Sequence, residues 1–196
     1  MELLLTYAIP RRDTNPIAHN LIKHFGSLIN VFEAQHEDLC MIDGIGENAA
    51  TIIKLILDVN RRYILSRFEG SVRLATTQEL AQYCMGLEFG RPYETLYMIC
   101  LSIQKNIRAT YMLDEGTLDN VRGDTRKFVS HAITSKAYSV ALTHNHPEGT
   151  PIPSEQDLIA TQLAIRALRA VNVKFEDHII VGSNNLWISM RESKYI

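Results

Sequence analysis

The stretch "THNHPEGTPIPSEQDL", residues 143–158, places two histidines, a serine and an aspartate close together in the chain. His144 and His146 close an apolar segment, "YSVALTH", which is typical of a β-strand. Side chains alternate along a strand, so both imidazoles should lie on one face and reach one metal ion. Asp157 lies one turn into a helix that we predict to begin at Ser154, where it can supply a third ligand.

Three nitrogen and oxygen ligands leave a fourth position open for water, which is the arrangement of a catalytic rather than a structural zinc site. Zinc lowers the pKa of such a water to about 7. A simpler interpretation is a strand end, a turn and a helix cap, because Ser154 and Asp157 also have nearly the spacing and residue types of a capping box. The two interpretations are compatible, since a cap would hold the aspartate still. We predict a metal site formed by His144, His146 and Asp157.

Hydrophobic periodicity and turn residues indicate which elements position this site. Strands are predicted at 94–102, 107–114, 138–144, 177–182 and 186–190, and helices at 76–87, with Thr77 as its cap, 124–136 and 154–173. Residues 1–67 are predicted to be helical, and residues 67–75 to connect the two parts. We therefore expect a mixed α/β domain over residues 76–196, preceded by a small all-α domain over residues 1–67.

The helical domain contains a glycine-rich turn, "IDGIGENAA", at residues 42–50. Gly44 and Gly46 allow a tight turn with unusual φ values, while Ile45 packs between two helices. The second helix then begins with outward-facing amides, which favour an anion such as a DNA phosphate. This pattern resembles the helix-hairpin-helix of DNA-binding and repair proteins, and Lys54 lies further along, where it could reach a DNA backbone. The alternative is a tight αα turn that only packs the domain.

The charge balance gives no global signal for nucleic acid. The 196 residues include 20 Lys and Arg against 22 Asp and Glu, a net charge of -2. Residues 1–67 hold seven Lys and Arg against eight Asp and Glu, a balance of 7 − 8 = −1. Any DNA contact must therefore be local, and Asp43 and Glu47, which flank the glycine turn, would repel phosphate.

The cysteines indicate a reducing compartment. Cys40, Cys84 and Cys100 are far apart and form no C-x-x-C pair, which is typical of reduced thiols in a cytoplasmic protein. The apolar run near the N-terminus has no basic segment before it, and no stretch of 18 apolar residues exists. We therefore expect neither a signal peptide nor a membrane span.

His-x-His, seven residues, Ser, two residues, Asp is similar to the JAMM motif of the JAB/MPN metalloproteases. Together with "DHIIVG" downstream and the hairpin-like N-terminal domain, the chain resembles the bacterial RadC family over nearly its whole length. The resemblance implies a mixed sheet with flanking helices, similar to cytidine deaminases, and zinc bound by His144, His146 and Asp157. It also implies that Ser154 stabilises an oxyanion and that Glu94 acts as general base and then as acid.

Glu94 begins "ETLYMICL", the place that the catalytic glutamate has in the family, with Glu88 and Glu115 as nearby alternatives. The chain departs from the family at Glu148, where serine is usual. We leave His178 out of the ligand set, because a histidine at a strand start commonly hydrogen-bonds within the core. Four further histidines have no metal spacing and are expected on the surface: His19, His24, His36 and His131.

The leading hypothesis is a zinc-dependent hydrolase that cleaves an amide bond, peptide or isopeptide, in an unknown peptide or protein substrate. The alternative is a DNA-binding accessory protein of repair or recombination, or a metal-dependent nuclease, that contacts duplex or branched DNA through the hairpin. A scaffold whose metal site is empty or structural is a third hypothesis.

Overall fold

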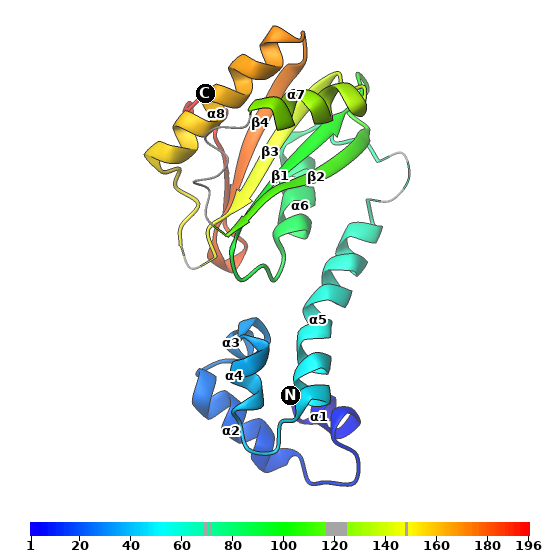
Figure 1. Ribbon diagram of the computed structural model, residues 1–196, viewed down its shortest axis with the longest axis vertical. Helices are drawn as coiled ribbons and strands as arrows, with labels where there is room; N and C mark the ends of the chain where they lie inside the picture. Colours follow the sequence, from blue (N-terminus) through cyan, green and yellow to red (C-terminus); the bar gives the residue numbers. More distant parts are fainter. Residues whose placement is uncertain (69, 71, 117–124, 148) are drawn as a thin grey trace. The chain divides into compact units, whose positions relative to one another are not determined.

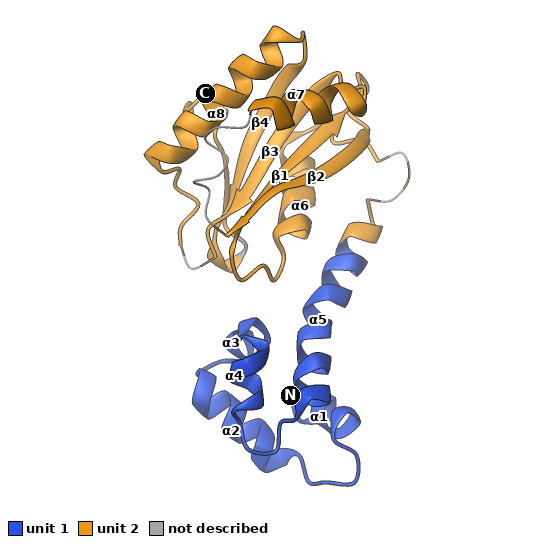
Figure 2. Ribbon diagram, viewed as in Figure 1, with its two compact units in different colours: residues 1–64 blue, residues 65–196 orange. Residues whose placement is uncertain are grey.

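The computed structural model describes residues 1–68, 70, 72–116, 125–147 and 149–196, and these fall into two compact units. The first unit is Met1–Ile64 and the second is Leu65–Ile196 (Figure 2). Glu148, the departure from the family pattern, lies outside the described residues. Within the described part of the chain, no helix is long and apolar enough to cross a membrane.

The N-terminal unit consists of short helices around one apolar core. Its helices are α1 (Glu2–Ala8), α2 (Asn15–Phe25), α3 (Leu28–Glu33), α4 (His36–Cys40) and α5 (Glu47–Ser66). The largest fully buried side chains of this core are Leu5, Leu21, Leu39 and Ile53. Gly26 has a φ of 84°, which ends α2, and the Ser27 side chain caps α3 by accepting a hydrogen bond from the Asn30 N–H at 3.1 Å.

The glycine turn between α4 and α5 depends on one of its two glycines. Gly44 has a φ of 88°, and a Cβ atom there would lie 2.7 Å from Ile17 Cδ1. Ile45 is buried in the core, and the Gly46 carbonyl accepts from Ala50 N–H at 3.0 Å to begin α5. A Cβ atom on Gly46 would meet nothing within 4 Å. The turn therefore requires glycine at position 44 and tolerates a side chain at position 46.

The C-terminal unit is a five-stranded mixed sheet with helices. Its elements are α6 (Thr77–Glu88), β1 (Glu94–Leu101), β2 (Ile107–Gly116), α7 (Thr125–Thr134), β3 (Ser139–Asn145), α8 (Glu155–Ala170), β4 (Lys174–Val181), the 3₁₀ turn η2 (Ser183–Asn185) and β5 (Trp187–Ser189). The strand order is β2-β1-β3-β4-β5. Only β3 and β4 are parallel, because α8 returns the chain between them; the other pairs are antiparallel.

Helices cover both faces of this sheet, as Figure 1 shows. On one face α6 packs through Leu80, Cys84 and Leu87 against the odd-numbered residues of β1, such as Ile99. On the other face, α7 and α8 pack against the even-numbered residues of β1 and β3: Leu96, Met98, Cys100, Val140 and Leu142. The expected α/β fold is confirmed, and strand parity decides which face each site residue occupies.

Several predicted boundaries are wrong, among them the start of β4, which is Lys174 rather than residue 177. Thr76, not Thr77, caps α6: its backbone is extended, and its hydroxyl accepts from the Glu79 N–H at 3.2 Å, while the Glu79 carboxylate accepts from the Thr76 N–H at 3.0 Å. Helix α8 ends at Ala170 rather than 173, because Asn172 has a φ of 59° and β4 already begins at Lys174.

We predict that serine at position 44 destabilises the N-terminal unit far more than serine at position 46. Gly44→Ser places a side chain at positive φ against Ile17 and should cost about 1–3 kcal/mol. Gly46→Ser enters open space at a helix start, where serine is favoured, and should change stability by less than about 0.5 kcal/mol. Urea unfolding followed by circular dichroism measures both, and equal effects would contradict this account.

Candidate metal centre

His144 and His146 lie at the end of the central strand β3, on the face that α8 covers. His144 is fully buried, and its even-numbered position places it with Val140 and Leu142 on that face. His146 follows β3 and extends its pairing, because its N–H donates to the Val181 carbonyl of β4 at 2.7 Å. The sheet therefore fixes the backbone of both histidines and directs both imidazoles to the same side.

Asp157 reaches the histidines from the first turn of α8. A capping box holds it: the Ser154 hydroxyl accepts from the Asp157 N–H at 3.2 Å, and Asp157 Oδ2 accepts from the Ser154 N–H at 2.7 Å. The Ser154 hydroxyl also lies 2.7 Å from Oδ2 and donates to it. The contacts that cap α8 also orient the Asp157 carboxylate, so that its Oδ1 faces His144.

The three predicted ligands converge. His144 Nε2 lies 3.0 Å from His146 Nε2 and 3.3 Å from Asp157 Oδ1, and His146 Nε2 lies 3.6 Å from Asp157 Oδ2. Tetrahedral ligands of zinc at bond lengths near 2.05 Å lie about 3.3 Å from one another. Within the described residues, these three side chains form one of two groups whose donor atoms lie close enough to share a metal ion.

The hydrogen bonds of the two Nδ1 atoms indicate which ring nitrogens of His144 and His146 carry a proton. His146 Nδ1 lies 2.9 Å from the Thr150 carbonyl, which can only accept, so Nδ1 carries the proton and donates. His144 Nδ1 lies 2.8 Å from His178 Nε2. If His178 Nε2 accepts there, both ligand histidines turn an unprotonated Nε2 toward Asp157, and three lone pairs face one another. Such an arrangement is favourable only around a cation.

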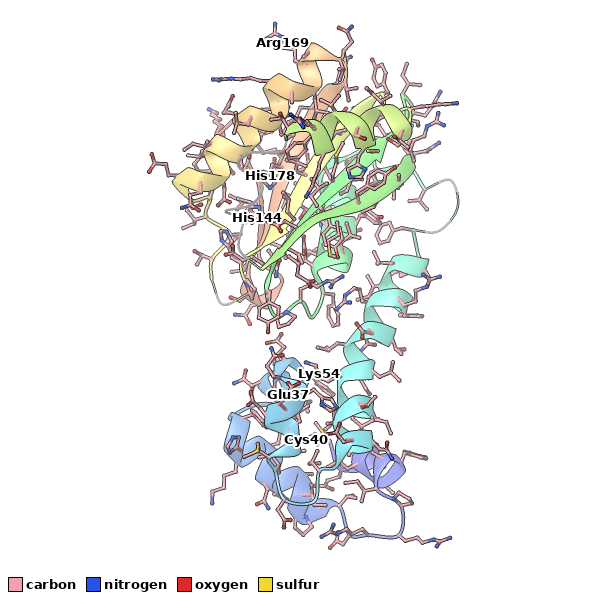
Figure 3. All side chains as sticks on the ribbon, viewed as in Figure 1. Glu37, Cys40, Lys54, His144, Arg169 and His178 are labelled. Carbon is pink, nitrogen blue, oxygen red and sulfur yellow. The ribbon has the colours of Figure 1, made fainter. Side chains whose placement is uncertain are left out.

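The contacts of Thr161, on α8, determine the protonation of His178. The Thr161 hydroxyl donates to the Asp157 carbonyl at 2.6 Å and lies 2.7 Å from His178 Nδ1. Because its one proton is used on the carbonyl, it accepts from His178 Nδ1–H. Burial lowers the pKa of His178 well below its usual range, so the ring is neutral and its Nε2 accepts from His144. Figure 3 shows His144 and His178 on neighbouring strands of the sheet.

The ionisation of Asp157 and His146 agrees with a site that requires a cation. Burial alone would raise the pKa of Asp157, but the adjacent rings of His144 and His146 and the hydrogen bond from Ser154 hold it well below its usual range. The pKa of His146 is raised because a proton on Nε2 would hydrogen-bond to Asp157, and the charge of Glu94 contributes in the same direction. The carboxylate is therefore ionised, and a proton or a metal ion is favoured at His146 Nε2.

Glu94 lies at the start of β1, on the same face as the histidines. It lines a cleft of about 1020 Å³ together with His146, Ser154 and Asp157. Continuing the β1–β3 register from Leu96 opposite His144 places Glu94 opposite His146. The cleft therefore brings together the predicted acid–base residue, the predicted serine and two of the three ligands.

Asn145, between the two histidines, fixes the segment that carries Glu94. It points to the opposite face, where its Oδ1 accepts from the Thr95 N–H at 2.7 Å and its Nδ2 donates to the Tyr93 carbonyl at 3.0 Å. These bonds fix both neighbours of Glu94 in the chain. The two alternative glutamates lie elsewhere: Glu88 is buried and accepts from the Thr95 hydroxyl, and Glu115 pairs with Arg91.

Gly182 allows the loop after His146 to approach the end of β4. A Cβ atom at Gly182 would lie 2.8 Å from the Gly149 carbonyl and 2.7 Å from Pro151 Cδ. The Ser183 N–H donates to the same Gly149 carbonyl at 3.0 Å. Neither this packing nor the roles of Asn145 and Thr161 has a signal in the spacing of the sequence.

The residues predicted to contact DNA lie in the N-terminal unit. Gly44, Ile45 and Gly46 form the turn before α5 as expected, and Gly46 is exposed. Lys54, labelled in Figure 3, is engaged inside the unit: its ammonium donates to the carbonyls of Phe32 at 3.0 Å, Glu33 at 3.4 Å and Ala34 at 2.7 Å. Burial lowers its pKa, and these three carbonyls, at the end of α3, use all its N–H donors.

A strand-end His-x-His and a helix-capping aspartate on a mixed sheet, with a glutamate opposite, form a candidate metal site of the kind expected for a JAB domain. Comparison with known families is consistent with this: the RadC-like JAB domain matches residues 74–195, and the chain belongs to this family. A UPF0758 protein of Janthinobacterium sp. (strain Marseille) is 29% identical over 187 residues, which cover 95% of this chain and 84% of the relative. A UPF0758 protein of Herminiimonas arsenicoxydans has the same identity and coverage.

We predict that the hydroxyl of Thr161 strengthens metal binding without touching the metal. Thr161→Val removes the acceptor of His178 Nδ1–H at nearly constant volume, so the tautomer of His144 is no longer fixed. The affinity for Zn²⁺, titrated against a chelating dye, should fall about 10- to 100-fold.

Thr161→Ser keeps the hydroxyl and serves as the matched control, with affinity close to that of the unmodified chain. Asp157→Ala lacks one proposed ligand and gives the Zn²⁺ affinity expected when the site is lost. A Thr161→Val protein that folds and binds Zn²⁺ as tightly as Thr161→Ser would contradict the role of this hydrogen-bond chain.

Proposed function

We propose that this chain is a zinc-dependent hydrolase that cleaves an amide bond, peptide or isopeptide. One observation carries the proposal: the lone pairs of His144, His146 and Asp157 face one point at an open cleft, and Glu94 lines the same cleft. Membership of the RadC-like JAB domain family supports metal-dependent hydrolysis in general, and the bond cleaved is our inference.

The donor set favours zinc. Two imidazole nitrogens and one carboxylate oxygen at near-tetrahedral separations suit Zn²⁺ and leave a fourth position toward the cleft. Bound there, zinc would act as a Lewis acid and lower the pKa of water to about 7. The chain itself supplies orientation, because His144 and Asp157 are almost fully buried and held by hydrogen bonds from outside the ligand set.

We assign the proton transfers to Glu94. Its carboxylate would accept a proton from the attacking water and deliver it to the leaving amine nitrogen. Its position supports this role, because the bonds from Asn145 hold the backbone on either side and tie it to the strand of the ligands. Neither Glu88 nor Glu115 lines this cleft.

Ser154 has a positioning role that takes precedence over the expected oxyanion role. Its hydroxyl proton is directed to Asp157 Oδ2 at 2.7 Å, so it keeps the carboxylate aimed at the histidines. To stabilise an oxyanion, the hydroxyl would have to turn from Asp157 toward the cleft that Ser154 also lines.

The cleft suits an extended polypeptide better than a small molecule. It is open to solvent, and its lining includes the exposed side chains of Tyr93 and Ile152. Apolar side chains at the rim can contact substrate residues on either side of the scissile bond. A peptide or protein substrate is therefore the class we propose.

The decisive variant is Glu94→Gln, which keeps the shape and removes the base. We expect it to bind Zn²⁺ normally and to lose about 10²- to 10⁴-fold in amide hydrolysis, measured on a peptide mixture by mass spectrometry. It should also retain bound substrate, which can be captured from cells. Glu115→Gln is the matched control, because Glu115 pairs with Arg91 and should be dispensable. Equal activity of both variants would refute the assignment.

A DNA-associated function is a second proposal, favoured by the turn at the start of α5. Gly44 gives the turn its left-handed backbone, Ile45 plugs the core, and Gly46 exposes the first amides of a 20-residue helix. Such amides can donate hydrogen bonds to a phosphate of duplex or branched DNA. The acidic Asp43 and Glu47 oppose this contact, so binding would be weak and dependent on salt.

A pair of charge variants tests the DNA proposal without straining the fold. Gly46→Asp adds a negative charge at the turn, where the structure has open space, and should abolish a low-salt electrophoretic shift of branched or duplex DNA. Asn60→Asp adds the same charge at an exposed position further along α5 and should reduce the shift only slightly. The absence of a shift in the unmodified chain, or equal shifts in both variants, would exclude the turn as the contact.

A further inference from the structure

The N-terminal unit contains a second group of potential metal ligands: His36, Cys40 and Glu47. His36 and Cys40 are four residues apart on α4 and therefore share one helical face. Glu47 is the first residue of α5, which the Gly44 turn brings back beside α4. The expectation that His36 lacks metal spacing is wrong, because the partners are a cysteine in its own helix and a glutamate across the turn.

The donor atoms of this group lie close together around the His36 ring. His36 Nε2 lies 3.5 Å from Glu47 Oε2, and Cys40 Sγ lies 3.9 Å from the other ring nitrogen, Nδ1. One ion would be bound through one of these two nitrogens, after a small rotation of the side chains. Donor atoms of all three side chains lie within 4.8 Å of one another. Ligands of one tetrahedral zinc ion lie about 3.3–3.7 Å apart, so binding would draw the three side chains slightly closer together.

The donor chemistry also selects a cation of this class. A thiolate, an imidazole and a carboxylate together are ligands of zinc, and the thiolate disfavours magnesium and calcium. The surroundings are acidic, because Glu37 and Asp38 occupy the first turn of α4. Cys40 is half-buried while Glu47 is exposed, so an ion can enter from solvent and still be partly shielded.

We propose that His36, Cys40 and Glu47 bind one zinc-class divalent ion that links α4 to α5 across the glycine turn. The site would be structural, because it joins two helices whose connection otherwise depends on the Gly44 turn and on core packing. It is independent of the His144 site, which contains no sulfur ligand. Figure 3 labels Cys40 and Glu37 in the N-terminal unit.

The sulfur ligand makes the test specific. Full-length chain is titrated with Co²⁺ and followed by its near-ultraviolet absorption, where a thiolate-to-cobalt charge-transfer band reports a Cys ligand only. We expect two bound equivalents and a band that persists in Asp157→Ala, which retains one equivalent. Cys40→Ser should abolish the band and one equivalent, and Cys84→Ser, a buried cysteine of the other unit, should change neither.

A second pair of variants keeps the test decisive if Cys40→Ser does not fold. Glu47→Gln removes a proposed ligand from an exposed position. It should raise the Co²⁺ concentration at which the band is half-saturated about tenfold or more. Glu37→Gln removes an equivalent charge from a nearby residue that is not a proposed ligand and should weaken Co²⁺ binding far less. No charge-transfer band in the unmodified chain, a band that survives Cys40→Ser, or equal effects of both glutamine variants would overturn the proposal.

Discussion

The convergence of three acceptor atoms is the constraint on which the C-terminal unit depends. His144 Nε2, His146 Nε2 and Asp157 Oδ1 would repel one another unless a proton or metal ion lay between them. The fold holds them together through rigid elements: a buried central strand for the histidines and the first turn of α8 for the aspartate. The folded chain therefore holds three mutually repelling acceptor atoms close together, and a bound cation would remove that repulsion.

The sequence could predict that the three proposed ligands converge, because the position of each follows from a local rule. Period-2 alternation puts His144 and His146 on one face, and a capping box fixes Asp157 one turn into its helix. Local rules also located the strands and the glycine turn. Where local signals competed, boundaries shifted: Thr76 rather than Thr77 caps α6, since only the extended residue can accept from Glu79.

The residues that support the ligands could not be predicted, because their partners are distant in the chain. His178 was expected to hydrogen-bond in the core, and it does; that it sets the tautomer of His144 through Thr161 follows only when β4 and α8 lie beside β3. Lys54 shows the converse. Its charge suggested a DNA contact, but the fold brings the end of α3 to its ammonium. The carbonyls at that helix end have no partner within the helix, and the ammonium donates hydrogen bonds to them.

Strand alternation lets three consecutive residues serve three purposes. His144 and His146 point toward α8, so the residue between them must point toward α6, where Asn145 clamps the backbone on both sides of Glu94. One strand thereby positions the proposed metal ligands on one face and, through Asn145 on the other face, the proposed acid–base residue Glu94. A one-residue slip of β1 against β3 would break both bonds of Asn145 and turn Glu94 to the wrong face. The position of Glu94 at the cleft therefore depends on the pairing of these two strands.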